Sequence, residues 1–328
     1  MEYQAQDGRE SLRKSPGWSG RQAAAILRQP RGLPTITMPL TYTRNFRIRH
    51  YECDAFGHLS NANYVRYMQE TAFDASAAAG YDSDAYNALG RYWLIRETDI
   101  EYLKPSQYDN TLEIKTWVMD FHRVRSRRAY EIRNKVNNDI VANASTDWVF
   151  LETGSNKPAK IPIEIKNAFF PEGPPDTFPT REKFPQPPPP PPGKFSMRIP
   201  VAWHDLDAVQ HVNNANYLKY AEECGMQVVA AHGWPISRMI EEGFAIIIRQ
   251  HQIQYLQPAV LGDELIISTW VSDVRRSTAT RHYLIKRQSD QERLALIHTR
   301  GVWIDLKTGR PIRIPENLLA DFSANIVS

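Results

Sequence analysis

The sequence predicts an α+β protein built from two copies of one unit, each with a single long helix packed on an antiparallel sheet. Three observations lead to this fold class. The string DAFGHLSNANYVRY at 54–67 returns as DAVQHVNNANYLKY at 207–220, 153 residues later, with eight of fourteen residues identical. After each string begins, apolar residues follow the 3.6-residue period of a helix. Beyond each helix, apolar and polar residues alternate, as they do in strands with one buried face.

The repeat extends far beyond these two strings. At the same offset, IEYLKP at 100–105 matches IQYLQP at 253–258. A period this long is typical of duplicated domains rather than of a solenoid. A chain of 328 residues also has the length of about two domains of ~150 residues each. We therefore expect one domain over 41–168 and a second over 195–328.

Each copy is predicted to contain the same elements in the same order. A short strand (NFRIRHYE or SMRIPVAW) precedes the repeated string, and a helix follows over 61–79 in the first copy and 214–232 in the second. Gly80 and Gly233 stand where a glycine commonly ends a helix. Four β-rich runs come next in each copy: 92–103, 111–120, 123–136 and 140–151, and then 244–256, 264–273, 276–288 and 293–305.

Two segments lie outside the repeated units. Residues 169–194 contain six successive prolines, which favour an extended polyproline II conformation. We interpret this segment as a spacer between the copies, with a ligand for a proline-binding module as the alternative. Residues 1–40 carry acidic residues and only a short apolar piece, so they make a poor secretory signal and are expected to form a mobile extension.

Composition excludes several classes of function. Hydrophobic residues make up 42% of the chain and charged residues 23%, which fits globular domains that bury a core. The net charge of +3 is too small to indicate nucleic-acid binding, and no apolar run is long enough to predict a membrane span. Cys53 and Cys224 have neither the spacing of metal ligands nor a disulfide framework. We therefore expect no metal ion and a reducing, cytoplasmic compartment.

The order of elements, with D-x-x-x-H-x-x-N-x-N-Y before each helix, resembles the hotdog fold of the 4-hydroxybenzoyl-CoA and acyl-ACP thioesterases. CDAFGHLSNANYVRY is similar to the acyl-CoA branch, and DLDAVQHVNNANYLKY looks more like the acyl-ACP branch, in which two hotdog units share one chain. That branch usually has Asn between the Asp and the His, where this chain has Phe56 and Val209. The resemblance implies a tandem double hotdog: a pseudo-dimer with sheets side by side, antiparallel helices and sites at the seam.

Thioester hydrolysis needs an activated water or a nucleophile, together with donors for the oxyanion that develops on the acyl oxygen. A carboxylate just before a helix can supply the first, and the unpaired N–H groups of the helix N-terminus supply the second. The resemblance implies Asp54 and Asp207 as the carboxylates, and the backbone N–H groups of Asn61 and Asn214 as the oxyanion donors. It implies that the imidazoles of His58 and His211 orient the carboxylate or bind substrate.

Other repeated positions are further candidates. Asn63 and Glu70 lie two helical turns apart, and so do Asn216 and Glu223, so each glutamate shares a helix face with an amide and is a candidate for positioning the lytic water. Small size at Gly57 would let a substrate approach the backbone, where the second copy has Gln210. Period-two spacing puts Arg123, Arg125 and Arg127 on one face of a strand, and the second copy has basic residues at Arg275 and Arg276. These arginines could bind CoA phosphates or an acidic carrier protein.

Each candidate also has a structural interpretation. The aspartates and asparagines could only cap the helices, and the histidines could make structural hydrogen bonds. The glutamates could lie in solvent or form ion pairs, and the arginines could be solvated edge-strand charges. Tyr64 and Tyr217 are expected to belong to the core.

The leading hypothesis is an acyl thioesterase of fatty-acid metabolism that acts on acyl-CoA or acyl-ACP without a metal or redox cofactor. We expect the first site to be competent and the second as well. A non-catalytic acyl-binding or scaffold protein stays open, although a scaffold would need only the core pattern in both copies. A hotdog dehydratase or hydratase is disfavoured, because neither copy has the Gly-Asp-x-Asn-Pro run of that group. Assembly beyond the pseudo-dimer stays open.

Overall fold

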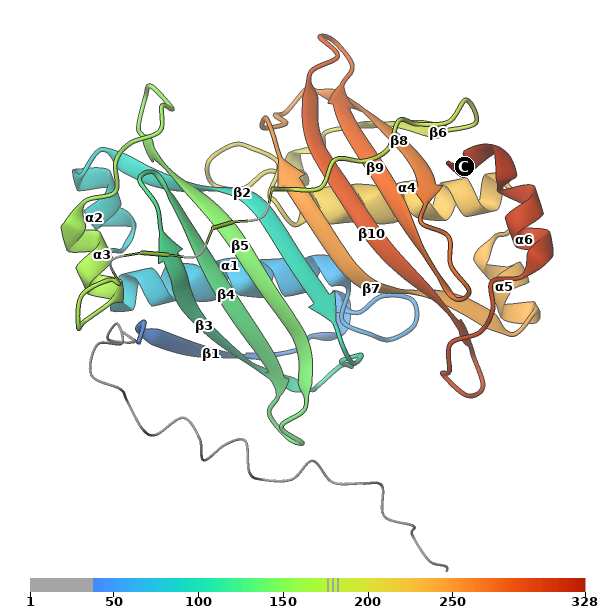
Figure 1. The fold of residues 1–328 in the computed structure, drawn as a ribbon, viewed down its shortest axis with the longest axis horizontal. Helices are drawn as coiled ribbons and strands as arrows, with labels where there is room; N and C mark the ends of the chain where they lie inside the picture. Colours follow the sequence, from blue (N-terminus) through green and yellow to red (C-terminus); the bar gives the residue numbers. More distant parts are fainter. Residues whose placement is uncertain (1–37, 176, 179, 182, 328) are drawn as a thin grey trace, which may run out of the picture. The chain divides into compact units, whose positions relative to one another are not determined.

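A continuous antiparallel sheet runs through the whole molecule in the computed structural model, which describes residues 38–327 apart from 176, 179 and 182 (Figure 1). Most of the predicted N-terminal extension therefore lies outside the described residues. The sheet has ten strands, five from each half, and the two halves meet edge to edge. The predicted side-by-side arrangement of two sheets is confirmed.

The strand order is the same in both halves, counted outward from the seam. The first half contributes β2 (Arg91–Tyr102), β5 (Ile140–Glu152), β4 (Arg125–Asn134), β3 (Thr111–Phe121) and β1 (Thr41–Arg47). The second contributes β7 (Phe244–Tyr255), β10 (Arg293–Asp305), β9 (Thr278–Arg287), β8 (Glu264–Ser272) and β6 (Phe195–Pro200). At the seam β2 pairs with β7, with Thr98 opposite Ile253. The four predicted β-rich runs of each copy are all strands, with ends within two residues of those expected.

The alternation of apolar and polar residues in the sequence of β3 corresponds to an alternation of buried and more exposed side chains in the structure. Leu112, Ile114, Thr116 and Val118 are buried, while the residues between them are half-buried or exposed. The buried side chains face the helices, and Arg125 and Arg127 of the neighbouring strand β4 form ion pairs on the opposite, outer face. The period of two therefore assigns each side chain to the helix-facing or the outer face of the sheet.

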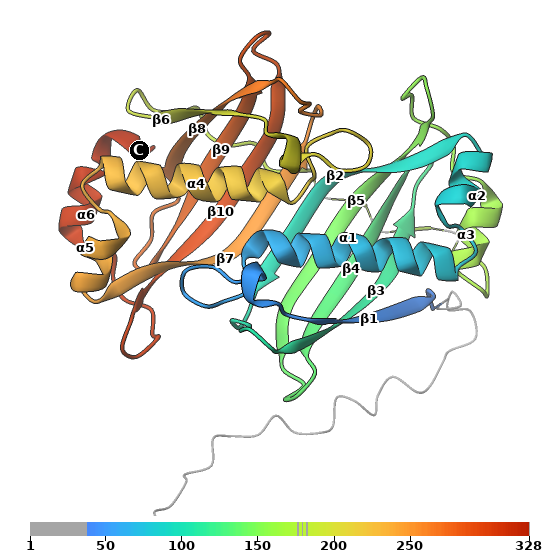
Figure 2. The ribbon, with the colours of Figure 1, turned by 180° about the vertical axis from the view of Figure 1, so that it is seen from behind.

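Two long helices cover one face of the sheet (Figure 2). These helices, α1 (Asn61–Ala78) and α4 (Asn216–Ala231), both begin near the seam and run outward in opposite directions. Gly80 and Gly233 follow their last turns with φ of +87° and +80°, the left-handed conformation that glycine adopts without strain. The predicted glycine stops and the antiparallel helices are confirmed. The second helix begins at 216 rather than 214.

Short helices close the ends of the two cores and have no counterpart in the sequence prediction. They are α2 (Ser83–Ala88), α3 (Ile163–Phe169), α5 (Ile236–Glu241) and α6 (Glu316–Asp321), with single 3₁₀ turns at His50–Glu52, Trp203–Asp205 and Ser323–Asn325. One or two turns give too little periodicity to read from a sequence. Phe169 and Phe322 at the ends of α3 and α6 pack into separate hydrophobic clusters, one in each half.

The main core runs without interruption beneath both long helices. Tyr64 and Tyr217 belong to it, as expected, and each hydroxyl has a buried partner: Tyr64 donates to Ser106 Oγ at 3.0 Å, and the N–H of Ala259 donates to Tyr217 at 3.1 Å. Burial raises the pKa of both phenols to about 12. These tyrosines therefore join the start of each helix to the loop that follows the first long strand.

The proline-rich segment lies against the outer face of the sheet as a strap (Figure 1). Arg181 forms ion pairs with the buried carboxylates of Asp120 and Asp147 in the first half. Further along, Trp270 Nε1 donates to the carbonyl of Pro188 at 3.2 Å in the second half. The predicted spacer therefore carries the chain between the halves and also packs on both of them.

Candidate active site

The turn before α1 places Asp54 beside the start of the helix. Its Oδ1 accepts hydrogen bonds from the N–H groups of Phe56 at 2.9 Å and His58 at 3.0 Å. The backbone N–H of Asp54 in turn donates to the carbonyl of His58 at 2.7 Å. This turn fixes one carboxylate oxygen by backbone contacts alone, while the Asp54 side chain stays exposed to solvent. A solvent-exposed, positioned carboxylate can accept a proton from water or attack an acyl carbon.

The second half repeats this turn. Asp207 Oδ1 accepts from the N–H of Val209 at 3.1 Å, and the Asp207 N–H donates to the carbonyl of His211 at 2.9 Å. The residue before the histidine is left-handed in both copies, with φ of +79° at Gly57 and +62° at Gln210. The turn conformation therefore accounts for glycine at 57, which the sequence had suggested for substrate access.

The start of α1 and the turn just before α4 each lie next to a tyrosine from the first long strand of the same half. Tyr102 Oη is 3.5 Å from the carbonyl oxygen of Asn61, and Tyr255 Oη is 3.1 Å from that of Asn214. The N–H groups at the start of α1 have no partner within the helix and carry its partial positive charge. An acyl oxygen placed at this end would meet the donors that a tetrahedral oxyanion needs.

The imidazoles of His58 and His211 are half-buried beside these turns. The backbone of His58 bridges to Gln107, so the turn is attached to the loop after β2. Neither imidazole forms a hydrogen bond with any residue in the described part of the chain. Within that part, no group of three or more His, Cys, Asp or Glu side chains could hold a metal ion, and Cys53 and Cys224 are both free thiols.

The repeated asparagines of the helices are buried and hold the site together. Asn63 Nδ2 donates to the carbonyl of Glu52 at 2.9 Å, and Asn216 Nδ2 donates to that of Asp205 at 2.8 Å. Each bond ties a helix to the 3₁₀ turn that precedes the aspartate loop. The side chains that were predicted to bind substrate are therefore used for packing in this structure.

The two glutamates predicted from the repeat point away from the aspartate loops. Glu70 is exposed and lies 3.6 Å from Arg44 Nη1. Glu223 is exposed and accepts from Gln227 Nε2 at 2.9 Å on the same helix. The ion-pair and solvated-face interpretations account for both contacts.

A neighbouring glutamate that the sequence prediction missed does reach the first site, and it comes from the other half. Asn61 Nδ2 donates to Glu222 Oε1 at 2.9 Å, so α4 supplies a carboxyl group to the start of α1. Burial raises the pKa of Glu222, the hydrogen bond from Asn61 lowers it, and the charge of Asp54 raises it further. The internal repeat does not indicate Glu222, because the first copy has Gln69 at the equivalent position.

The arginines predicted to bind phosphate lie on the outer face or at far strand ends. Arg125 Nε is 2.8 Å from Asp147 Oδ1, and Arg125 also lies 3.7 Å from Glu97. Arg123 lies in the exposed turn before β4. In the second half Arg275 is exposed and pairs with Asp273 at 3.0 Å, in the turn that also contains Arg276.

The strand register shows how far Arg125 lies from the helix N-terminus. Arg125 is opposite Val149 on β5, while Ala142, seven residues away on the same strand, is opposite Tyr102 beside Asn61. Seven residues of strand span about 23 Å. The structure therefore does not bring these arginines together with Asp54.

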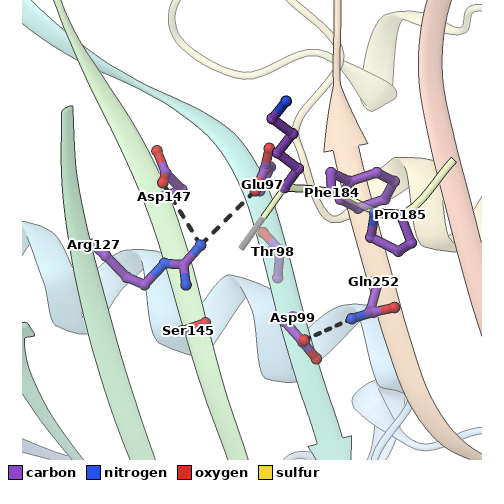
Figure 3. Close-up of a pocket in the computed structure, with 10 residues that line it drawn as sticks. Glu97, Thr98, Asp99, Arg127, Ser145, Asp147, Phe184, Pro185 and Gln252 are labelled. Atoms are coloured by element: carbon purple, nitrogen blue, oxygen red, sulfur yellow. Dashed lines mark hydrogen bonds and ion pairs between the residues drawn. The ribbon is translucent and has the colours of Figure 1, made fainter. Parts of the chain in front are cut away.

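A cavity of about 110 Å³ lies on the outer face, between the strap and strands β2, β5 and β7 (Figure 3). Its charged side chains largely pair with one another. Arg127 lies 4.0 Å from Glu97 and 3.9 Å from Asp147, and Gln252 donates to Asp99 at 2.9 Å. The sheet separates this cavity from the helix N-termini, so it is not part of the candidate active site.

A continuous antiparallel sheet with one central helix per half and antiparallel helices at the seam defines a double hotdog protein. Two family models match the chain. The acyl-ACP thioesterase N-terminal domain matches residues 39–169, and the thioesterase-like superfamily matches residues 201–322. Each half of the chain is therefore similar to a thioesterase family.

For the first half, the matching family model differs from the motif assignment, which placed the first copy nearer the acyl-CoA branch and the second nearer the acyl-ACP branch. The acyl-ACP model matches the first half. The motif assignment depended on a few positions such as Gly57, and the left-handed turn explains that glycine without reference to the acyl carrier.

Curated relatives are similar over part of their length. The chain is 27% identical over 208 residues to a chloroplastic palmitoyl-acyl carrier protein thioesterase of Cuphea hookeriana, covering 60% of this chain and 50% of that protein. It is 24% identical over 207 residues to the chloroplastic oleoyl-acyl carrier protein thioesterase 1 of Arabidopsis thaliana, covering 59% and 57%. The chain therefore spans about half the length of the curated relatives it matches.

Solved structures share the fold. The 12:0-ACP thioesterase of Umbellularia californica superposes with a TM-score of 0.62 at 20% identity, over 81% of this chain and 97% of that one. An acyl-ACP thioesterase of Bacteroides thetaiotaomicron gives 0.60 at 17% identity, over 80% and 97%. These likenesses extend across both halves and establish the double hotdog architecture.

Proposed function

We propose that this protein hydrolyses acyl thioesters, with Asp54 and Asp207 as the site carboxylates. The observation that carries the proposal is the exposed Asp54, fixed by two backbone N–H groups directly before the start of α1. A similar turn at Asp207 supports it, because a carboxylate that served only as a cap would need neither the repeated histidine nor the asparagine. The similarity of each half to a thioesterase family supplies the reaction class.

The site supplies two groups for the reaction, the N-terminus of α1 and the carboxylate of Asp54. The thioester carbonyl lies at the N-terminus of α1, where the N–H of Asn61 and the helix dipole stabilise the oxyanion. Asp54 takes a proton from water as the water oxygen bonds to the carbonyl carbon, or attacks that carbon itself to give an acyl–aspartate anhydride that water then hydrolyses. The C–S bond then breaks, the electron pair goes to sulfur, and the thiolate takes up a proton. The products are the carboxylic acid and the free thiol.

For the carrier, we propose an acyl-ACP with acyl-CoA as the alternative. Relatives named as acyl carrier protein thioesterases support this choice, as does the match of the first half to an acyl-ACP family model. We further propose domains over 41–168 and 195–328, joined by 169–194 with 1–40 as an extension, and a reducing, cytoplasmic compartment that fits the two free thiols. None of the helices in the described ranges is long and apolar enough to cross a membrane.

The test is hydrolysis of a panel of acyl-ACP and acyl-CoA thioesters by the wild type, Asp54→Asn, Asp207→Asn and the double variant. We expect the activity of the double variant to fall at least ~100-fold, as is typical when a general base or nucleophile is removed. A wild type that hydrolyses no thioester would exclude the enzyme, and saturable acyl binding without turnover would favour a scaffold. Full activity in the double variant would exclude these aspartates.

A further inference from the structure

The Asp54 site is built from both halves of the chain. The Asp54 loop and the start of α1 come from the first half, and the Glu222 carboxyl that contacts Asn61 at 2.9 Å comes from the second. The 153-residue offset aligns Glu222 with Gln69 on α1. From the pseudo-twofold symmetry that relates the halves, we expect Gln69 to face the Asp207 site in the same way.

The two helix positions thus differ in chemistry. A glutamate can accept and release a proton, and a glutamine cannot. Glu222 Oε1 is hydrogen-bonded, whereas Gln69 Oε1 is buried and has no hydrogen-bond partner in the described part of the chain. The turns before the helices are similar in the two copies, and the acid-to-amide difference is an asymmetry in proton-transfer chemistry between the two sites.

We propose that Glu222 is the proton-transfer residue of the Asp54 site, supplied across the seam, and that Gln69 leaves the Asp207 site without such a group. This inference rests on the proposed thioester hydrolysis and divides it unequally between the two sites. The first site carries most of the turnover. The second binds acyl thioester at the start of α4 and turns it over slowly.

The step assigned to Glu222 balances without another reactant. Asp54 takes one proton from the attacking water as the water oxygen bonds to the acyl carbon, and this proton passes on to the Glu222 carboxylate. When the C–S bond breaks, the proton passes from Glu222 to the departing sulfur. The carboxylate is regenerated, and the net reaction is thioester plus water to carboxylic acid plus thiol.

The surroundings of Glu222 suit this task. The bond from Asn61 Nδ2 fixes Oε1, and a carboxylate so held presents its second oxygen in a defined direction. Charged and titratable groups on four elements interact electrostatically with the Glu222 carboxyl. They are Asp54 in the loop before α1, Lys219 on α4, Tyr102 on β2 and Tyr283 on β9. Burial is the largest effect and raises the pKa of Glu222, which favours proton uptake by this carboxylate.

The central experiment compares Glu222→Gln with Glu241→Gln, an exposed glutamate on α5 in the same half. Glutamine keeps the shape and can still accept from Asn61, so the seam should stay folded, which thermal unfolding checks. We expect kcat to fall about 100-fold in Glu222→Gln with KM within threefold, partial recovery in Glu222→Asp, and no change in Glu241→Gln. The acidic limb of the kcat/KM profile should shift to lower pH in Glu222→Gln.

A gain-of-function arm tests the asymmetry. In the Asp54→Asn background the remaining turnover belongs to the second site, and adding Gln69→Glu should raise that turnover at least ~10-fold. A folded Glu222→Gln variant with the same kcat and pH profile as Glu241→Gln would overturn the role of Glu222. No gain from Gln69→Glu would overturn the assigned asymmetry. An inactive wild type, by contrast, would remove the proposed hydrolysis itself and this inference with it.

Discussion

Arg66 on α1 reaches across the seam and donates from Nη2 to Asn216 Oδ1 on α4 at 2.8 Å. Its Nη1 donates to Asn63 Oδ1 at 3.0 Å, so a single guanidinium joins the two asparagines that hold the aspartate loops. Both asparagines are buried and spend their amide N–H groups on backbone carbonyls. Arg66 therefore links the two half-sites directly, and the sequence comparison did not single it out.

Loss of this link should destabilise the seam. Arg66→Ala leaves two buried amide oxygens without their charged donor, and hydrogen bonds to charged groups contribute about 1.5–3 kcal/mol each. We expect the free energy of unfolding to fall by about 2–3 kcal/mol, measured by urea denaturation. Lys219 is the aligned residue of the second half and is exposed, so Lys219→Ala is the matched control and should cost less than about 1 kcal/mol. Equal losses in the two variants would contradict the bridging role.

The left-handed turn before each histidine predicts opposite responses to substitution. Gly57→Ala introduces a Cβ that meets no atom within 4 Å, so any cost comes from the φ of +79° and should be about 1 kcal/mol. Gln210 already has a φ of +62°, so Gln210→Gly relieves that strain and should leave stability unchanged or raise it by up to about 1 kcal/mol. Urea denaturation of both variants checks this pair. Destabilisation by Gln210→Gly would show that its side chain makes a contact that matters more than its backbone.

Arg128 is a buried cation on the helix-facing side of β4, and no carboxylate among the described residues pairs with it. Its Nη1 lies 3.4 Å from Thr116 Oγ1 and its guanidinium 5.4 Å from the ring centroid of Phe169, and burial lowers its pKa. Replacing a buried charge by an apolar side chain of similar volume is often neutral or stabilising. Arg128→Met should therefore change stability by no more than about 1 kcal/mol, or increase it.

Arg181→Met is the contrasting variant, because it removes one charged partner from each of two buried carboxylates. Asp120 and Asp147 both pair with Arg181, and removing one partner of a buried pair typically costs about 3–5 kcal/mol. Thermal unfolding or urea denaturation of the two variants measures the difference. A larger loss in Arg128→Met than in Arg181→Met would mean that Arg128 has a partner beyond its described contacts.

Acid should weaken the attachment of the strap. His298 Nε2 lies 2.9 Å from the Pro185 carbonyl, His298 Nδ1 lies 2.7 Å from His282 Nδ1, and His282 Nε2 lies 2.7 Å from Ser272 Oγ. The proline carbonyl can only accept, so His298 is the donor there, and both rings are neutral in this chain of bonds. Burial, together with the charges of the nearby His298 and Arg281, lowers the pKa of His282 to about 4.

The direction of the pH effect follows from that shift. The unfolded chain binds the proton at about pH 6.5, whereas the folded protein resists it down to about pH 4. The stability due to neutral His282 is complete above pH 6.5 and is lost as pH falls towards 4, by about 3 kcal/mol. Urea denaturation at pH 7.5, 5.5 and 4.5 should give a flatter dependence for His282→Asn than for wild type. Parallel curves would contradict this assignment.

The repeat and the two periodicities already predict most of the fold, because they report local properties of the chain. The 3.6-residue pattern and the glycines at 80 and 233 place both helices, and the alternation along β3 identifies its buried face. The one- and two-turn helices escape this reasoning, since their periods are too short. The paired D-x-x-x-H strings likewise identify both aspartate loops by sequence alone.

Only the tertiary structure decides which glutamate reaches the site. Glu222 and Glu223 are adjacent, and a helix turns about 100° per residue, so one meets Asn61 across the seam and the other meets solvent. Repetition favours residues kept in both copies, whereas the seam joins unlike residues from different halves. The sequence by itself determined two similar units with a carboxylate before each helix. Their packing into one sheet decided which side chains complete each site, because those contacts join positions about 150 residues apart.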